Sequence, residues 1–376
     1  MKYYIIAGEA SGDLHGSNLI KELHKLDTNA AIRCWGGNKM EAAGAMLVKD
    51  YRELAFMGFT EVIKNLPTIF RNLSFCKKDI LQHRPDILIL IDYPGFNLRI
   101  AKWAKQQGLK IVYYISPQIW AWKENRVHSI KKCVDKMLVI LPFEKAFYKK
   151  WNYEVEYVGH PLVEVIEEFE NQKSKPDRYR VENKKLVIAL LPGSRRQEIL
   201  KKLPVMLQVA KHYPDYKFIV AKAPGLPDEF YNELLQPYSN VDSVANKTYE
   251  LLSQSQAALV TSGTATLETA LFAVPEIICY KGNGISYQIA KRLIKIKYIG
   301  LVNLIMDKQV VKELIQDMLT EKNLVAELDL LLTNENKKQQ LAKDYADLKK
   351  LLSAGGHASY NAAKSIYDFI TKPQAG

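Results

Sequence analysis

The chain of 376 residues lacks long apolar runs and has few cysteines. No stretch of about 18 consecutive apolar residues occurs, so the sequence predicts no helix that spans a membrane. The apolar run at the start is too short for a secretion signal, and we expect no leader. The four cysteines are far apart and form no CxxC pair: Cys34, Cys76, Cys133 and Cys279. Buried, reduced thiols are therefore expected, which suits a cytosolic protein.

Several motifs that carry well-known chemistry are also missing. The sequence contains no GxxxxGK[ST], HExxH, DxD or GxSxG. Its seven histidines are dispersed, and no His and Cys cluster has the spacing of metal ligands. We therefore expect neither a metal nor a cofactor. His15 and His160 lie nearest to candidate sites, and we interpret His160 as structural.

Acidic residues are in the minority, and the basic excess is local. Lys and Arg number 53 against 41 Asp and Glu, a formal net charge of +12. Between Phe56 and Lys150 there are 17 basic and 7 acidic residues, a difference of +10. This excess favours anionic partners, whether nucleic acid, phosphorylated substrates or an anionic membrane.

The chain alternates short apolar runs with amphipathic stretches, which predicts two doubly wound, parallel α/β domains. We expect an N-terminal domain over 1–163, a linker over 164–185, and a C-terminal domain over 186–345. A helix over 346–376 is a candidate to return to the N-terminal domain, and the whole tail from Val310 to Ile370 has helical periodicity. The predicted strands are Tyr3–Ala7, Ile87–Ile91, Ile111–Ile115, Lys136–Leu141, Leu186–Leu191, Lys217–Ala221, Ala257–Thr261 and Pro275–Tyr280. Ligands bind at the carboxyl ends of such strands, and we expect a cleft between the domains.

The first strand is followed by Gly8-Glu9-Ala10-Ser11-Gly12-Asp13 and then a predicted helix. Glycines let the backbone turn sharply, and the helix N-terminus favours an anion. Helix capping by Ser11 or Asp13 explains the same residues equally well.

Asp92 ends the nearly all-apolar strand Ile87–Ile91. A carboxylate at that place is partly desolvated, which raises its pKa toward that of a general base. An Asx-type cap of the following turn is the alternative, and both interpretations can hold together. We favour the base.

The strand Ile111–Ile115 leads into a loop that contains Ser116, Gln118, Trp120 and Trp122. These side chains can form an amphipathic wall against a sugar or an acyl chain. Ordinary aromatic packing is the stronger expectation for at least one of the two tryptophans.

The second domain contains two turns suited to phosphate. Gly193-Ser194-Arg195 follows a strand and begins a helix, so that Arg195 and the turn amides can bind a diphosphate. Ser262-Gly263-Thr264 repeats the arrangement, and Glu268 lies one turn further on, where a carboxylate can accept from ribose hydroxyls. Helix caps with solvent-facing charges are the alternative.

An apolar stretch from Ala55 to Phe75 carries Lys64 and Arg71, with Lys77 and Lys78 beyond it. It can lie at a membrane interface, line an acyl-chain groove, or form a helix pair that packs on the sheet.

The ordered set of motifs resembles the lipid-A-disaccharide synthase family over nearly the whole chain. The segments that carry the resemblance are Gly8–Asp13, Met57-Gly58, Ile91-Asp92 with Pro94 and Phe96-Asn97, Ser116-Pro117 with Trp120–Trp122, Leu141–Glu144, Val158–His160, Leu191–Arg195, Ser262–Ala265 with Leu267-Glu268, and Asn303-Leu304 with Lys312–Leu314 and Gln316. The resemblance implies the GT-B fold, with two Rossmann-like domains that face a central cleft.

The resemblance also implies a reaction. The family transfers 2,3-diacylglucosamine from UDP-2,3-diacylglucosamine to 2,3-diacylglucosamine 1-phosphate, called lipid X. The products are the β-1,6-linked lipid A disaccharide 1-phosphate and UDP, the anomeric configuration inverts, and no metal is characteristic. The implied setting is cytoplasmic, peripheral to the anionic inner-membrane surface, with no nucleic acid partner; a homodimer is left open.

Residue by residue, Asp92 matches the family's proposed general base. Gly95 departs from the family, which often has Asp there, and Asp92 is thus the only carboxylate of that loop. The implied donor residues, which bind UDP, are Gly193, Ser194, Arg195, Ser262, Gly263, Thr264, Thr266, Glu268, Asn303 and Gln316. The implied acceptor or cleft residues are Glu9, Ser11, Gly12, Asp13, Gln118 and Trp120.

Two other functions compete with this one. The first is another GT-B enzyme that uses a UDP-sugar, such as the peptidoglycan glucosaminyltransferase or a UDP-sugar epimerase. Such an enzyme explains the two phosphate-type turns of the second domain. An enzyme with a soluble substrate, however, does not need the apolar stretch. A non-catalytic protein that binds anionic lipid or nucleic acid fits the basic region. It leaves the turns of the second domain unexplained, and no aromatic-basic RNA motif is present.

Overall fold

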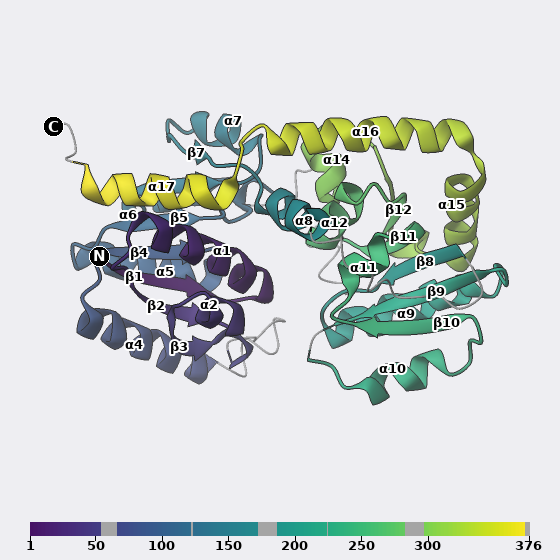
Figure 1. The fold of residues 1–376 in the computed structure, drawn as a ribbon, viewed down its shortest axis with the longest axis horizontal. Helices are drawn as coiled ribbons and strands as arrows, with labels where there is room; N and C mark the ends of the chain where they lie inside the picture. Colours follow the sequence, from purple (N-terminus) through teal and green to yellow (C-terminus); the bar gives the residue numbers. More distant parts are fainter. Residues whose placement is uncertain (54–65, 122, 172–185, 224, 283–296, 373–376) are drawn as a thin grey trace. The chain divides into compact units, whose positions relative to one another are not determined.

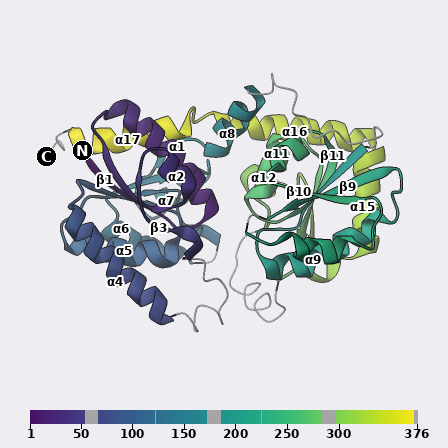
Figure 2. The same ribbon diagram turned by 60° about the horizontal axis from the view of Figure 1, so that its bottom comes forward.

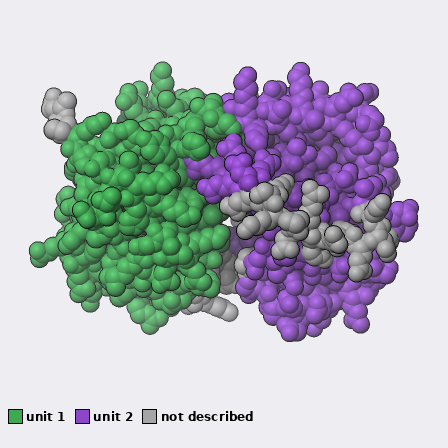
Figure 3. Space-filling model, in the orientation of Figure 1, with its two compact units in different colours: residues 1–161, 352–376 green, residues 162–351 purple. Residues whose placement is uncertain are grey.

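The computed structural model describes residues 1–53, 66–121, 123–171, 186–223, 225–282 and 297–372. It divides into unit 1, residues 1–161 and 352–376, and unit 2, residues 162–351 (Figure 3). Among the described helices, none is long and apolar enough to cross a membrane. Trp122, residues 55–65 of the apolar stretch and residues 172–185 of the predicted linker lie outside the described residues. Residues 164–171 of that linker are helical.

Unit 1 contains a seven-stranded parallel sheet with the order β3-β2-β1-β4-β5-β6-β7. The strands are β1 (Lys2–Ala7), β2 (Ala31–Gly36), β3 (Met46–Asp50), β4 (Ile87–Ile91), β5 (Ile111–Tyr114), β6 (Lys136–Val139) and β7 (Glu156–Tyr157). The five residues of β4 are all buried, as expected for a central parallel strand covered on both faces.

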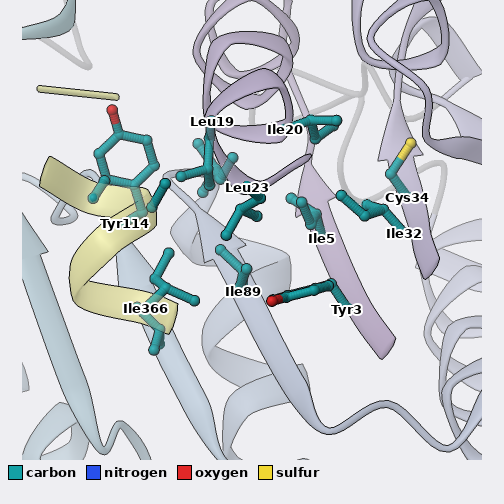
Figure 4. Packing of buried hydrophobic residues seen from close by; sticks show 14 of the residues in the cluster. Tyr3, Ile5, Leu19, Ile20, Leu23, Ile32, Cys34, Ile89, Tyr114 and Ile366 are labelled. Atoms are coloured by element: carbon teal, nitrogen blue, oxygen red, sulfur yellow. The ribbon is translucent and has the colours of Figure 1, made fainter. Parts of the chain in front are cut away.

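Helices cover both faces of this sheet (Figures 1 and 2). One face carries α1 (Ala10–Leu26), α2 (Asn38–Ala42) and α17 (Ala358–Thr371), and the other carries α4 (Leu66–His83), α5 (Pro94–Gln106) and α6 (Val127–Cys133). The short helix α7 (Glu144–Lys149) follows β6. Figure 4 shows the core under α1, where Leu19 and Leu23 pack over Ile5 and Ile89.

The C-terminal helix α17 belongs to unit 1, although most of the preceding helix α16 (Glu335–Ser353) belongs to unit 2. Ile366 of α17 is completely buried in the core that α1 and the sheet form (Figure 4). The Nδ2 atom of Asn361 donates to the carbonyl of Val158 at 3.1 Å, and Ser365 Oγ donates to Glu156 at 2.6 Å. These contacts join the end of the chain to the edge strand β7.

Unit 2 contains a six-stranded parallel sheet with the order β10-β9-β8-β11-β12-β13. Its strands are β8 (Leu186–Leu191), β9 (Tyr216–Lys222), β10 (Val241–Ala245), β11 (Ser255–Thr261), β12 (Glu276–Tyr280) and β13 (Lys312–Ile315). The described α-helices are α8 (Pro161–Asn171), α9 (Arg196–Ala210), α10 (Asp228–Leu235), α11 (Thr248–Leu252), α12 (Thr264–Leu271), α14 (Leu301–Met306), α15 (Glu321–Thr333) and α16. Residues of α11 and α12 pack on one face of the sheet, while α9 and α15 lie against the other (Figure 2).

The prediction of two doubly wound Rossmann-like units is confirmed, since the strand order 3-2-1-4-5-6 occurs twice. In each sheet the order reverses between the first strand and its neighbour, which are β1 and β4 in unit 1 and β8 and β11 in unit 2. Loops after these strands border the crevice where such sheets bind ligands. Asp92 and the turn from Gly193 to Arg195 both lie in such loops.

The prediction that the whole tail from Val310 is helical is wrong at its start. Lys312–Ile315 forms β13, which pairs in parallel with β12. Four residues are too few for a clear period, and the strand is stabilised by its pairing with a neighbour that is distant in sequence.

We expect Ile366→Ala to lower the free energy of unfolding of unit 1 by about 2–5 kcal/mol, because it leaves a cavity in the core under α1. All 5 tryptophans belong to unit 1, so urea unfolding followed by tryptophan fluorescence reports on that unit. Tyr360→Ala, at an exposed position of the same helix, is the control. Equal effects of the two substitutions would contradict the role of α17 in the core.

Candidate active site

Asp92 lies at the carboxyl end of β4 in a strained backbone conformation. Its φ is 42° and that of Tyr93 is 47°, the left-handed region that costs non-glycine residues about 1–3 kcal/mol. The Asp92 carbonyl accepts from Asn97 Nδ2 at 2.8 Å and from Tyr113 OH at 2.5 Å. Asn97 is completely buried and also donates to the carbonyl of Ile91 at 3.1 Å. This pair of donors therefore holds the turn that presents the Asp92 carboxylate.

The Asp92 carboxyl has a strongly perturbed pKa. Burial is the main cause and the negative charge of Glu9 is the second; together they raise the pKa to about 7, against the effect of a backbone hydrogen bond at Tyr93. A carboxylate with a pKa near neutrality can accept a proton from a hydroxyl during reaction and release it afterwards.

The loop after β1 lies against the Asp92 turn. A Cβ on Gly8 would be 2.3 Å from Cγ of Tyr93, so the Tyr93 ring requires a glycine there. Gly12 is buried beside Ala7, and Ser11 is partly exposed. The loop brings Glu9 within electrostatic reach of Asp92, as the pKa of Asp92 shows.

Asp13, in contrast, has its carboxylate engaged inside unit 1. Its oxygens accept from the backbone N–H groups of Gly37 at 2.8 Å, Met40 at 3.0 Å and Lys39 at 3.3 Å. Asp13 therefore caps the N-terminus of α2. The sequence suggests capping by Asp13, but of the helix that follows β1.

The loop after β5 is anchored by Glu144, a residue for which the sequence alone indicated no role. Glu144 is buried, and one of its oxygens accepts from Trp120 Nε1 at 3.3 Å while the other accepts from the Leu141 N–H at 2.9 Å. Burial raises the pKa of Glu144 to about 7. Trp120 is itself buried, edge-on to Phe143, so packing describes it better than a ligand wall. Its neighbour in the loop, Gln118, is exposed.

In unit 2, the turn after β8 is exposed at the start of α9. Gly193 has a φ of 114°, and Ser194 and Arg195 are exposed. Arg195 Nη1 lies 3.2 Å from Oε1 of Glu198. The guanidinium and the N-terminus of α9 together present positive charge to solvent, which suits a phosphate group.

The turn after β11 begins α12, with Gly263 as N-cap. Its hydroxyls divide into two groups. Ser262 donates to the carbonyl of Ile299 at 3.0 Å, and the buried Thr266 donates to the carbonyl of Gly263 at 2.8 Å, so both stabilise the backbone. Thr264 is exposed and available to a ligand.

Glu268 is partly exposed one turn into α12 and accepts from Tyr249 OH at 2.9 Å. The rings of Phe169 and Phe272 pack against Tyr249. Tyr249 therefore fixes the orientation of Glu268. Sequence reasoning missed it, because no local pattern links α11 to α12.

Asn303 and Gln316 differ in what they leave for a ligand. Asn303 is completely buried; its amide donates to Val311 and Glu313, and its oxygen accepts from two backbone N–H groups. It thus organises the approach to β13. The Gln316 oxygen accepts from the Gly282 N–H at 3.1 Å, while its Nε2 is buried with no partner in the described part of the chain. Across the described residues, no group of three or more His, Cys, Asp or Glu could hold a metal ion.

Comparisons with known proteins give one family over nearly the whole chain. The family model described as lipid-A-disaccharide synthetase matches residues 3–369. The chain is 39% identical to the lipid-A-disaccharide synthase of Geobacter metallireducens over 98% of this chain and 97% of the relative. It is 38% identical to lipid-A-disaccharide synthase 1 of Legionella pneumophila, over 97% and 96%.

Solved structures show the same fold at low sequence identity. UDP-GlcNAc 2-epimerase from Neisseria meningitidis, bound to UDP-GlcNAc, aligns with a TM-score of 0.67 at 14% identity over 99% of this chain and 100% of that one. The glycosyltransferase of kitacinnamycin aligns with a TM-score of 0.69 at 14% identity, over 98% and 99%.

We expect Glu9→Gln to lower the pKa of Asp92 below about 7, since the Glu9 charge disfavours ionisation of Asp92. Carboxyl ¹³C chemical shifts of protein labelled at aspartate measure this titration, and the spectrum of Asp92→Asn assigns the resonance. Glu41→Gln, at an exposed site of the same unit, should leave the titration unchanged. An Asp92 titration that does not move in Glu9→Gln would contradict the coupling.

Proposed function

This chain belongs to the lipid-A-disaccharide synthase family of glycosyltransferases, and we propose that Asp92 is the base of its reaction. The observation that carries this proposal is a carboxyl with a pKa raised to about 7 at the point where the strand order reverses. In the proposed reaction, Asp92 takes the proton of the 6-hydroxyl of lipid X as that oxygen attacks C1 of the UDP-2,3-diacylglucosamine donor. The new β-1,6 bond forms as the bond from C1 to the diphosphate breaks, and UDP leaves with the bonding electrons.

We propose that unit 2 holds the UDP portion of the donor. Arg195 and the amides of its turn supply positive charge and donors for the diphosphate, and the turn around Gly263 and Thr264 adds further donors. Glu268, oriented by Tyr249, accepts from the ribose hydroxyls. The base and the leaving-group site lie on different units, and their meeting when a cleft closes stays a prediction.

The other GT-B functions considered from the sequence have less support. The identity of 39% to a lipid-A-disaccharide synthase extends over 98% of the chain. The likeness to an epimerase has only 14% identity and shows the fold alone.

We propose that α4 places unit 1 against an anionic bilayer, where both acylated substrates reside. The helix exposes Phe70 (61%) and Leu81 (49%), and basic side chains such as Arg71 and Lys78 are exposed along the same arc of the helix. Apolar side chains interleaved with cations are typical of helices that lie at a membrane interface.

We expect Asp92→Asn to lower turnover by roughly 10²–10⁴-fold and to leave UDP affinity unchanged, because only proton acceptance is lost. Mass spectrometry of the disaccharide formed from UDP-2,3-diacylglucosamine and lipid X measures turnover, and calorimetry measures UDP binding. In the unsubstituted enzyme, kcat/KM should fall as the pH drops below about 7, since Asp92 becomes protonated there. Near-normal turnover of Asp92→Asn would exclude Asp92 as the base. Activity on unacylated UDP-N-acetylglucosamine alone would favour an epimerase.

We expect Phe70→Asp to reduce flotation with vesicles that contain phosphatidylglycerol by at least severalfold, because it puts a charge on the exposed apolar arc of α4. Leu330→Asp, at an exposed apolar position of unit 2, is the matched control and should float normally. Salt should weaken flotation. Binding that is independent of anionic lipid and unaffected by Phe70→Asp would rule out this surface.

A further inference from the structure

Lys202 is a buried lysine that the proposed mechanism does not use. It lies on α9, two turns from the turn that carries Arg195, and its side chain is only 3% exposed. Burial lowers the pKa of the Lys202 ammonium, so its position has a cost in free energy that an apolar residue would not have. The neighbouring Lys201 is exposed on the same helix.

Among the described residues, the carboxylate within ion-pair distance of Lys202 belongs to Glu198, which lies beneath the donor turn. A Cβ on Gly193 would be 2.8 Å from Oε2 of Glu198. Oε2 is 4.0 Å from Lys202 Nζ, and Oε1 is 3.2 Å from Arg195 Nη1. One carboxylate is therefore shared between an exposed guanidinium and a buried ammonium.

This sharing matters at a site that is to receive a diphosphate. Glu198 carries the same sign of charge as the ligand, and it forms an ion pair with Nη1 of the Arg195 guanidinium. A diphosphate that binds to the Arg195 guanidinium therefore comes close to the Glu198 carboxylate, which already interacts with Nη1. The carboxylate would then lie beside an incoming anion, which is unfavourable unless another cation remains with it.

We propose that Lys202 is a positioning residue of the donor site: it holds Glu198, so that the Arg195 guanidinium can bind the diphosphate of a nucleotide. Lys202 does not touch the ligand and acts through Glu198. The inference rests on the proposed function only in placing a nucleoside diphosphate at Arg195.

The test compares Lys202→Met with Lys201→Met. Methionine has an unbranched side chain only one heavy atom shorter than lysine and carries no charge, and the protein should fold because an apolar residue replaces a buried cation. By calorimetry, Lys202→Met should bind UDP roughly tenfold more weakly and bind uridine, which has no phosphate, with unchanged affinity. Lys201→Met removes the same charge from the surface and should change UDP affinity by less than about twofold.

Glu198→Gln provides the second arm, because it removes the charge that Lys202 is proposed to hold. Glu198→Gln and the double variant Glu198→Gln/Lys202→Met should therefore bind UDP equally well. A purely structural role of Lys202 predicts instead that the double variant stays weak and that uridine binding falls together with UDP binding.

The outcomes separate this inference from the proposed function. If unsubstituted protein binds no UDP, the donor site itself is wrongly placed and both proposals fail. If it binds UDP and Lys202→Met binds as tightly, or Lys201→Met loses as much affinity, only the role of Lys202 is overturned.

Discussion

The two hydrogen bonds to the carbonyl of Asp92 are the constraint on which unit 1 depends for its chemistry. Asn97 and Tyr113 donate to that carbonyl from α5 and β5, the next two elements along the chain. They stabilise two consecutive left-handed residues that would otherwise relax into an ordinary turn. Because these two donors bind the backbone, they do not occupy the Asp92 carboxylate, which lies in a desolvated place near Glu9 and has a backbone hydrogen bond at Tyr93. The backbone bonds thus fix the position of the base, and burial sets its pKa.

The other polar residues of the strand-end loops also have one of two roles: some bind backbone groups, and others remain accessible to a ligand. Asp13, Asn303 and Thr266 are buried and satisfy backbone groups that a loop at a sheet edge leaves open. Among the residues that remain accessible to a ligand, Arg195 interacts with Glu198 in the first turn of the same helix, and Glu268 is oriented by Tyr249 from α11. Each of these accessible groups therefore has a protein partner that limits its movement, as expected where a site must keep its geometry while substrates exchange.

The charge environment of the proposed base in unit 1 is the opposite of that at the proposed diphosphate site in unit 2. In unit 1, a like charge and burial raise the pKa of a carboxyl so that it can accept a proton. In unit 2, a carboxylate lies between two cations at the turn proposed for a diphosphate. A base needs an environment that disfavours its charge, whereas a leaving-group site needs excess positive charge.

The sequence by itself determined the fold class and the residue types at the strand ends. Apolar runs such as Ile87–Ile91 are too short for a typical helix and predict buried strands, and covalent order fixes which residue stands at the end of each. The same order could not distinguish Asp13, which caps a helix, from Asp92, because the partners of a carboxylate come from distant segments. It could not identify β13 either, since an edge strand of four residues is stabilised by pairing with β12. Tyr249, Glu144 and Lys202 gained their roles only when tertiary packing brought them to Glu268, Trp120 and Glu198. The local sequence pattern indicates which residues are buried. Only the folded chain determines which polar side chains form hydrogen bonds and ion pairs with one another, and the chemistry depends on those contacts.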